Sequence, residues 1–443
     1  MAHYYYVSKG NLVSAQSTSI KRLTRKQKWY KEQRFMLKFE IISPTFIPAQ
    51  YVGLAMLKLI TNANLFAPQA MGMCHVLVAA EKIIYIGSQV PVLDSSLEVE
   101  ITDLDGATLI PGFIDGHAHI TGGGGETGPA SRVPPVFLSQ FTQFGVTSVV
   151  GVLGTDDLTR NTQSIVAQAY GLREEGMSAW CHTGGYHLPL TTLTGSARSD
   201  IVFIDPIIGV GELAISDHRS SQPTLDEFLR VASEAHVAGL MTGKAGILHI
   251  HMGDGQRGLA LVREALDTSE IPARVFNPTH INRNKNLFDE ALPLSLRGVR
   301  LDITAFPAGH SEPGWSAAEA FLRYREGGYP ADKITISSDG GGCLPHFNEE
   351  GEPVRMGIGC SSTLIETLRE VLNHHVPMAE ALAPLTSNVA DLLKFSHKGR
   401  LQQGHDADMV VLDQHHTISD VMARGRWHKR HGQCQIFGTY EAS

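Results

Sequence analysis

The stretch that decides the fold is Pro111-Gly112-Phe113-Ile114-Asp115-Gly116-His117-Ala118-His119. The apolar run from Ala107 to Ile114 predicts a buried strand, and two histidines follow it. Side chains at positions i and i+2 of an extended chain point to the same side. His117 and His119 can therefore direct both imidazoles at one metal ion, which predicts a metal site where this strand ends.

The composition is that of a globular protein with a large core, since 42% of the 443 residues are hydrophobic and 19% are charged. The net charge of −8 argues against a nucleic-acid partner, whose binding surfaces are usually basic. The five cysteines form no Cys-x-x-Cys pair, so we expect a reducing, cytoplasmic compartment. Apolar runs are too short to cross a bilayer, and we expect no membrane partner.

Both ends of the chain differ in character from the middle. Residues 1–55 include a basic segment without the pattern of a secretory signal, and we expect an N-terminal extension outside the core. Short strands and turns begin near Met56 and resume after residue 404. We therefore predict a small β-sandwich domain built from residues 56–110 and 396–443, with a catalytic domain, residues 111–395, inserted between them.

The middle of the chain alternates strands with helices. The predicted strands are Thr108–Ile114, Thr147–Val152, Met177–Cys181, Ile207–Ile215, Gly246–His251, Arg274–Thr279, Gly298–Ile303 and Lys333–Ser338. Amphipathic stretches such as Leu225–Ala238 follow most of them. Eight such units over this length predict an α/β fold, a (β/α)8 TIM-like barrel. The glycine run 122–125 matches no phosphate-binding motif, and we interpret it as a flexible loop.

Polar residues fall at the carboxyl ends of several predicted strands, where active sites of this fold lie. They are His117, His119, Glu212, His251, His280 and Asp339. Imidazoles and carboxylates suit zinc or a similar divalent ion, and this set is too large for one tetrahedral site. We therefore predict two metal ions that share a hydroxide. His249 forms a second His-x-His pair with His251, and we choose His251 because it comes last.

Several motifs resemble the amidohydrolase superfamily and, within it, the isoaspartyl (β-aspartyl) dipeptidase family. The superfamily marks are residues 111–119, His251, His280, Ser338-Asp339-Gly340 and Ala407-Asp408. The more specific marks are residues 122–126, 150–156, 216–220 and 278–284. The similarity covers the chain from Met56 to its end. It implies hydrolysis of β-aspartyl dipeptides by a metal-dependent enzyme that forms homo-oligomers.

The resemblance also implies roles for individual residues. His117, His119 and Asp339 would hold one zinc ion, and His251 and His280 the other. Asp339 would also act as general base and acid. Tyr186 would donate a hydrogen bond to the oxyanion, and Glu126 would bind the substrate ammonium. Arg219 and Arg283 would bind the substrate carboxylates, and Thr155 would lie in the same pocket. These residue types suit a substrate with one ammonium and two carboxylates.

The chain departs from the family pattern at two positions. The family has a carbamylated lysine that bridges the metals at the end of the fourth strand, where this chain has Glu212. Glutamate has the same charge and two oxygens, so we expect it to bridge without added carbon dioxide, with Lys244 as a fallback ligand. Cys343 stands where the family has a substrate-binding serine, and a thiol is a weaker hydrogen-bond partner.

Two alternative functions stay open at this point. The first is another amidohydrolase, such as a dihydroorotase-like or hydantoinase-like cyclic amidase or an aminohydrolase. The second is an inactive scaffold, which the missing lysine would suit and the remaining ligands argue against. Glu126 with its glycine-rich loop and the Arg219/Arg283 pair favour the dipeptidase.

Overall fold

The computed structural model describes residues 7–8, 11–12, 56–307, 313–347 and 353–441, with only the backbone described at 7–8, 11–12, 345–347, 353 and 355. The chain divides into two compact units, Met1–Leu54 and Ala55–Ser443. In the first unit, β1 (Val7–Ser8) and β2 (Asn11–Leu12) pair antiparallel. The predicted extension, residues 1–55, otherwise lies outside the described residues.

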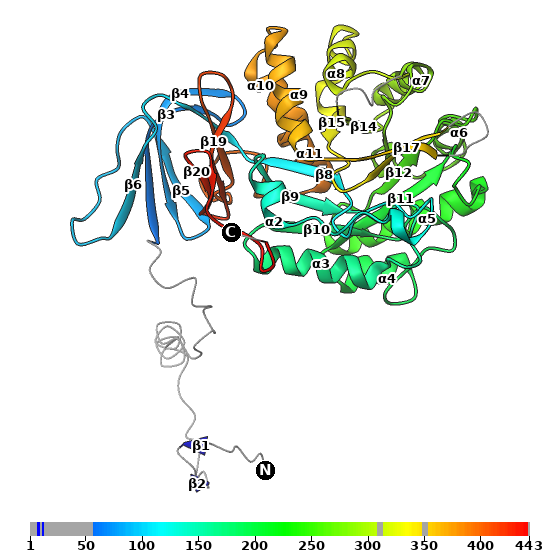
Figure 1. Ribbon diagram of the computed structural model, residues 1–443, viewed down its shortest axis with the longest axis horizontal. Helices are drawn as coiled ribbons and strands as arrows, with labels where there is room; N and C mark the ends of the chain where they lie inside the picture. Colours follow the sequence, from blue (N-terminus) through cyan, green and yellow to red (C-terminus); the bar gives the residue numbers. More distant parts are fainter. Residues whose placement is uncertain (1–6, 9–10, 13–55, 308–312, 348–352, 442–443) are drawn as a thin grey trace, which may run out of the picture. The chain divides into compact units, whose positions relative to one another are not determined.

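The second unit contains the predicted barrel (Figure 1). Its parallel strands are β8 (Phe113–Ala118), β9 (Val146–Gly151), β10 (Ser178–Thr183), β11 (Ile207–Ile215), β12 (Leu248–Met252), β13 (Phe276–Thr279), β14 (Leu301–Thr304) and β15 (Ile334–Ser337). β8 to β13 form one sheet in chain order, and β14 pairs with β15. Contacts of β13 with β14 and of β15 with β8 complete the ring. The fold class is confirmed.

Helices cover the outside of the ring (Figure 1). They are α2 (Leu138–Thr142), α3 (Thr162–Glu174), α4 (Ala197–Phe203), α5 (Leu225–Thr242), α6 (Ala260–Thr268), α7 (Lys285–Leu296), α8 (Ala317–Glu326), α9 (Ser362–Asn373), α10 (Met378–Leu382) and α11 (Ser387–Leu393). Capping boxes at Asn161, Thr224 and Ser316 begin α3, α5 and α8 by pairing the first free N–H groups. Short 3-10 turns are η2 (Pro129–Ser131), η3 (Ala273–Val275), η4 (Ala331–Lys333) and η5 (Ala383–Leu385).

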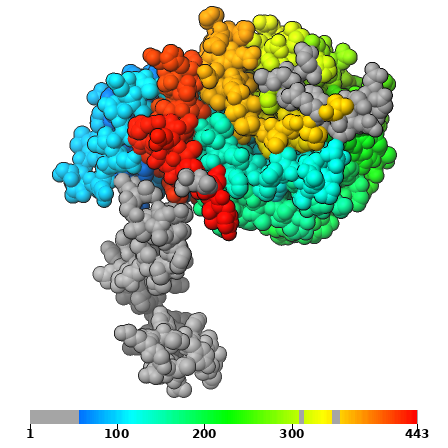
Figure 2. Space-filling model, viewed as in Figure 1, coloured from blue at the N-terminus to red at the C-terminus, as the bar shows by residue number. Residues whose placement is uncertain are grey.

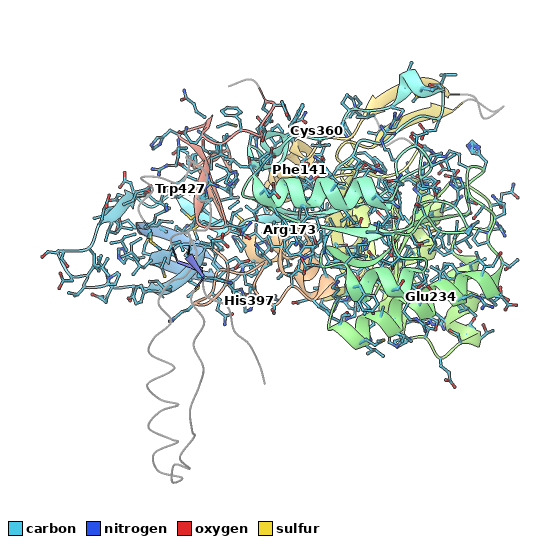
Figure 3. The ribbon with its side chains drawn as sticks, turned by 90° about the horizontal axis from the view of Figure 1, so that it is seen from below. Phe141, Arg173, Glu234, Cys360, His397 and Trp427 are labelled. Carbon is cyan, nitrogen blue, oxygen red and sulfur yellow. The ribbon has the colours of Figure 1, made fainter. Side chains whose placement is uncertain are left out.

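Strands from both ends of the second unit form one nine-stranded sheet. They are β3 (Leu57–Phe66), β4 (Ala70–Ala79), β5 (Lys82–Gly87), β6 (Val99–Asp103), β7 (Thr108–Pro111), β18 (Met409–Leu412), β19 (Ile418–Ala423), β20 (Arg426–Arg430) and β21 (Gln433–Cys434). β7 pairs with β18, so the start and the end of this unit lie side by side, blue against red in Figure 2. The labelled Trp427 lies among these strands in Figure 3, and Phe141, Arg173 and Glu234 lie with the barrel helices.

This sheet has a hydrophobic core of its own. Its members include Ile60, Leu65, Val76, Met409 and Trp427, all buried. A chain that buries apolar side chains in two separate clusters stabilises each part by its own packing. The boundaries at residues 110 and 396 stay a prediction.

The first predicted barrel strand is two strands in the structure. β7 ends at Pro111 in the nine-stranded sheet, and β8 begins at Phe113 in the barrel. Gly112 joins them, and a Cβ added there would lie 2.3 Å from Thr147 Oγ1. Only glycine therefore fits where the chain passes from one sheet to the other. β8 also continues past Ile114 to Ala118, so that His117 lies within the strand.

A hairpin, β16 (Cys343–Phe347) with β17 (Pro353–Ile358), follows the barrel's last strand and was absent from our expectations. Among the described residues, the longest apolar helices fall short of what a membrane crossing needs.

Candidate metal centre and substrate site

The predicted metal ligands meet at the carboxyl ends of the barrel strands. His117 belongs to β8, Glu212 to β11 and His251 to β12, whereas His280 directly follows β13. His280 and Asp339 have φ of 60° and 52°, a left-handed conformation that ends each strand sharply at this rim. The barrel therefore brings together residues that are far apart in the sequence.

Glu212 lies at the centre of this group. Its Oε1 is 3.3 Å from His119 Nε2 and 3.6 Å from His117 Nε2. Its Oε2 is 3.1 Å from His251 Nδ1 and 3.4 Å from His280 Nε2. The side chain is 1% exposed. Each carboxylate oxygen thus faces a different pair of imidazoles, which is the arrangement that a bridging ligand requires.

Asp339 completes the half of the group formed by β8. Its Oδ1 lies 3.1 Å from His119 Nε2 and 3.5 Å from His117 Nε2. Among the described residues, four buried atoms of these ligands have no hydrogen-bond partner, namely His117 Nε2, His119 Nδ1, Glu212 Oε1 and Asp339 Oδ1. Buried polar atoms are rarely left unpaired unless a ligand uses them.

The donor atoms fall into three overlapping sets within 4.8 Å: His117/His119/Glu212, His117/His280/Asp339 and Glu212/His251/His280. Nitrogen and carboxylate oxygen are the ligands that zinc and similar ions take. The residues present therefore fit divalent metal ions.

The charges of the buried side chains also fit a divalent metal ion. Burial lowers the pKa of His119, but the nearby carboxylates of Asp339 and Glu212 outweigh it and raise the pKa to about 10. Burial raises the pKa of Asp339, but the nearby imidazoles of His117 and His119 hold it well below its usual range. The two buried carboxylates thus demand positive charge, which protons or a divalent cation can supply.

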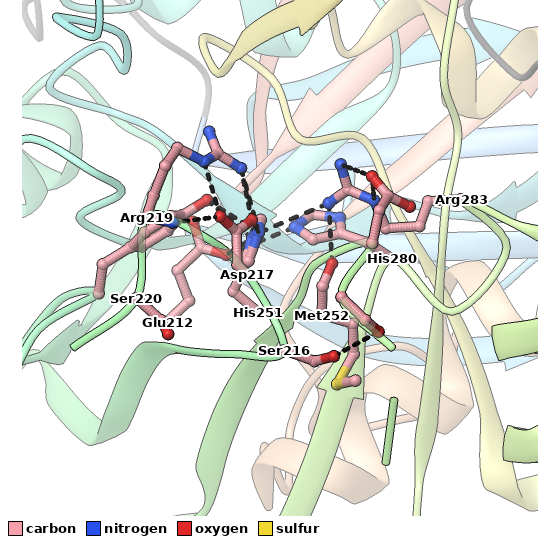
Figure 4. A network of polar contacts seen from close by, with 12 residues as sticks. Glu212, Ser216, Asp217, Arg219, Ser220, His251, Met252, His280 and Arg283 are labelled. Atoms are coloured by element: carbon pink, nitrogen blue, oxygen red, sulfur yellow. Dashed lines mark hydrogen bonds and ion pairs between the residues drawn. The ribbon is translucent and has the colours of Figure 1, made fainter. Parts of the chain in front are cut away.

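Partners behind the ligands orient two of the imidazoles. His251 Nε2 is 3.0 Å from Asp217 Oδ2, so its Nδ1 faces Glu212 (Figure 4). His280 Nδ1 is 2.6 Å from Thr304 Oγ1, so its Nε2 faces Glu212. A hydrogen bond to one ring nitrogen fixes which nitrogen is left for a metal. Asp217 was missed as a functional residue, although it lies in the motif at residues 216–220.

Arg219 connects the metal centre with the predicted ammonium ligand. Its Nε and Nη2 lie 3.0 and 2.8 Å from the two oxygens of Asp217 (Figure 4). Its Nη1 lies 3.4 Å from Glu126 Oε1. Tyr186 stands beside this group, with its hydroxyl 2.7 Å from His251 Nδ1. Burial raises the pKa of Tyr186 well above its usual value, and the charge of Glu212 adds to this, so the phenol stays protonated.

Arg283 approaches the centre from the loop after β13. Its Nη1 donates to the Met252 carbonyl at 2.8 Å and lies 3.5 Å from His251 Nε2. Its Nε lies 3.1 Å from Asp254 Oδ2. Asp254 is largely exposed, so this ion pair marks the outer edge of the site.

Cys343 and Thr155 lie at the same end of the barrel. Burial raises the pKa of Cys343 to about 12, and the charge of Glu126 acts in the same direction. Thr155 is half-buried and follows Gly154. A Cβ added to Gly154 would lie 2.8 Å from His119 Cε1 and 3.7 Å from Glu212 Oε1. Gly154 is therefore a second residue that the sequence analysis missed, because a glycine's role in close packing leaves no chemical signal.

Two other expectations change. Lys244, the fallback ligand, lies outside the metal centre, where its Nζ donates at 2.7–2.9 Å to the carbonyls of Ile201, Ile204 and Ile207. In the glycine run 122–125, close backbone contacts also require glycine, in addition to the flexibility that we expected. Gly122, with φ 79°, passes so near Val133 that an added Cβ would lie 1.9 Å from its carbonyl oxygen.

The comparisons with known proteins agree with this geometry. The family model described as "Amidohydrolase family" matches residues 217–437. A crystal structure of β-aspartyl dipeptidase from Fervidobacterium islandicum AW-1, in complex with β-Asp-Leu dipeptide, is 40% identical, with a TM-score of 0.84. The match covers 88% of this chain and all of that one. A second structure of β-aspartyl dipeptidase from the same organism is 39% identical, with a TM-score of 0.80 over 87% of this chain and 100% of that one.

More distant matches include one solved structure, which shares the fold, and one relative matched by sequence. A dihydropyrimidinase from Brevibacillus agri NCHU1002 is 16% identical, with a TM-score of 0.59 over 86% of this chain and 97% of that one. A deacetylase from Brucella anthropi is 24% identical over 80% of this chain and 84% of its own length. The chain therefore belongs to the amidohydrolase family. Within that family, the relatives that match at about 40% identity are β-aspartyl dipeptidases, which confirms the resemblance seen in the sequence motifs.

Proposed function

We propose that this enzyme hydrolyses the isopeptide bond of β-aspartyl (isoaspartyl) dipeptides. The observation that carries the proposal is the charge pattern beside the metal ligands. Arg219 and Arg283 each lie 3.5 Å from His251 Nε2, and Arg219 contacts Glu126 at 3.4 Å. The two Fervidobacterium islandicum structures, at about 40% identity, are β-aspartyl dipeptidases, and one is a complex with β-Asp-Leu.

The substrate's charges match these side chains. A β-aspartyl dipeptide carries an α-ammonium and two carboxylates close to the scissile amide. Glu126 would bind the ammonium, since its Oε2 is buried and has no hydrogen-bond partner among the described residues. Arg219 and Arg283 would bind the carboxylates, because guanidinium groups can grip a carboxylate with two hydrogen bonds. Thr155 and Cys343 would line the same pocket.

Two divalent ions, which we take to be zinc, would complete the site. The ligands would be His117, His119 and Asp339 for one ion and His251 and His280 for the other. When bound, such ions lower the pKa of a water molecule and polarise the scissile carbonyl. Glu212 would bridge them in place of a carbamylated lysine, which the opposed orientation of its two oxygens supports. Activity should then be independent of bicarbonate.

The chain's own residues would move the proton and hold the charge. Asp339, ionised and facing the ligand pair, would accept a proton from the attacking water as the C–O bond forms. It would pass that proton to the departing amine as the C–N bond breaks. Tyr186 would donate its hydroxyl to the oxygen on which negative charge develops. Its high pKa supports this role, because it keeps the phenolic proton available.

Two further proposals concern the compartment and the assembly of the enzyme. Five free cysteines, with none paired, support a cytoplasmic enzyme. We also propose a homo-oligomer that binds small dipeptides, on the basis of the family resemblance.

A cyclic amidase or an aminohydrolase is the alternative. It has less support, because the match to dihydropyrimidinase is 16% identical and reflects the fold alone. One assay separates these functions: hydrolysis of β-Asp-Leu, α-Asp-Leu, dihydroorotate and hydantoin, each with and without a chelator. We expect cleavage of β-Asp-Leu only, abolished by the chelator. A purified, metal-loaded enzyme that leaves β-Asp-Leu intact would overturn the proposal.

A further inference from the structure

His249 lies behind the metal ligand His117, on the side of that imidazole away from Glu212. His117 Nδ1 is 2.8 Å from His249 Nε2, and His249 Nδ1 is 2.6 Å from Asn277 Oδ1. The Asn277 Nδ2 donates to the Arg300 carbonyl at 2.8 Å. His117, His249 and Asn277 are at most 2% exposed. These groups form one chain of hydrogen bonds that links β8, β12 and β13 to Arg300, the residue before β14.

The positions of the protons in this chain follow from its far end. A carbonyl oxygen only accepts hydrogen bonds, so the amide nitrogen of Asn277 must face Arg300 and its oxygen must face His249. That oxygen also only accepts, so His249 carries its proton on Nδ1. A neutral imidazole that carries its proton on Nδ1 accepts a hydrogen bond at Nε2.

The consequence reaches the metal site. If His249 Nε2 accepts, then His117 Nδ1 must donate, and the lone pair of His117 lies on Nε2. That nitrogen is the atom directed at Glu212 and Asp339, 3.6 and 3.5 Å away. We propose that His249 and Asn277 are positioning residues that fix His117 in the one neutral form able to bind metal through Nε2. This inference rests on the metal site of the proposed function.

This chain of hydrogen bonds also gives a role to each histidine of the second His-x-His pair, His249 and His251. His251 faces Glu212, and His249, two residues earlier on the same strand, acts on the β8 side of the centre through His117. β12 thus serves both halves of the site from one face. A neighbouring residue offers a matched control, because the buried ring of His182 stacks on His249 with centroids 5.5 Å apart.

The test compares His249→Phe with His182→Phe in the full-length protein. Zinc affinity is measured by competition with a chelator, and the visible spectrum of the cobalt-loaded protein reports the ligand geometry. We expect His249→Phe to weaken one of the two zinc-binding steps by about 10–100-fold, as loss of a ligand's hydrogen-bond partner typically does. It should also change the cobalt spectrum. His182→Phe should leave affinity within about threefold, a limit well below that range.

A second pair of variants covers the case in which His249→Phe does not fold. His249→Gln offers a neutral side-chain oxygen as acceptor for the His117 Nδ1 proton and should retain zinc affinity, whereas Asn277→Leu removes the acceptor of the His249 Nδ1 proton and should lose it. Equal affinities in both members of each pair would overturn the inference. Because zinc binding is measured directly, the inference can stand or fall separately from cleavage of β-Asp-Leu.

Discussion

Two buried carboxylates inside the barrel have opposite surroundings. Asp302, on β14, accepts hydrogen bonds from three hydroxyls, those of Thr279, Thr335 and Ser337, at 2.6–2.7 Å. Glu212, on β11, is surrounded by four imidazoles, and its Oε1 has no hydrogen-bond partner among the described residues. Both side chains are buried, yet only one has its oxygens satisfied by neutral donors from neighbouring strands.

The difference shows how to separate a structural acid from a ligand. Three hydroxyl donors satisfy Asp302 without any further group, so it holds β13, β14 and β15 together. Four imidazoles around Glu212 can act as donors only if they carry protons, and the same nitrogens can bind metal when they do not. Burial alone does not distinguish the two acids, but the chemistry of their partners does.

Glu212→Ala tests this comparison most strongly. The variant loses the carboxylate that faces both imidazole pairs, so metal content should fall from about two ions per chain to one or none, with loss of hydrolysis. Metal analysis of the purified protein measures this. Asp302→Asn is the matched control and should keep its metal. Full metal content in Glu212→Ala would show that Glu212 is not the bridge.

Glu126→Gln tests a third carboxylate, at the rim of the site. Loss of a charged hydrogen bond to the substrate ammonium costs about 1.5–3 kcal/mol. We therefore expect the KM for β-Asp-Leu to rise by about 10–100-fold, with a smaller change in kcat. Steady-state kinetics measure both constants. Glu264→Gln, on the exposed face of α6, should leave them unchanged. A kcat effect alone would contradict a role in ammonium binding.

Asp302→Asn tests the structural side of the comparison. An amide nitrogen cannot accept, so at least one buried hydroxyl among Thr279, Thr335 and Ser337 would lose its acceptor. The free energy of unfolding should fall by about 1–3 kcal/mol, as measured by urea denaturation, while metal content and kcat stay near wild type. If the variant lost metal but not stability, the two acids would not differ as we describe.

His428 extends the comparison to a buried histidine outside the barrel, on β20. Burial lowers its pKa to about 3, so it is neutral in the folded protein and takes up a proton on unfolding at acidic pH. A pKa lower in the folded state gives stability above about pH 6.5 that is lost as pH falls towards 3. Each pH unit in that window should cost at most about 1.4 kcal/mol.

His428→Phe should flatten this pH dependence, as urea denaturation between pH 7 and 5 can measure. The exposed His431 provides a control, and His431→Asn should keep the wild-type slope. An unchanged slope in His428→Phe would mean that other groups carry the acid sensitivity.

The sequence predicted most of the barrel because its strands are strongly apolar and regularly spaced. Strand Ile207–Ile215 was predicted to the residue, and all nine of its residues are buried. The first strand was predicted as one piece because nothing local distinguishes Gly112 from the apolar residues around it. Its role depends on Thr147, which approaches only in the folded chain.

In the site too, local sequence patterns were recognisable, whereas contacts between distant residues were not. His117 and His119 were recognisable because ligands at i and i+2 leave a local pattern. Asp217 and His249 act through partners on other strands, so their roles depend on distances that a sequence does not contain. Glu212 was placed by counting within a motif, and its two-sided contacts became visible only in three dimensions.

The pairing of β7 with β18 has a consequence for how the protein is made. Leu109 pairs with Val411, and residues 112–408 lie between the two strands. On the ribosome, β3 to β7 emerge first but cannot complete their sheet until almost the whole chain has been synthesised. The barrel is finished earlier, because its last strand ends at Ser337. During translation, the open edge of β7 is therefore exposed for most of the synthesis time, which makes it the part of the nascent chain most in need of protection from wrong pairing.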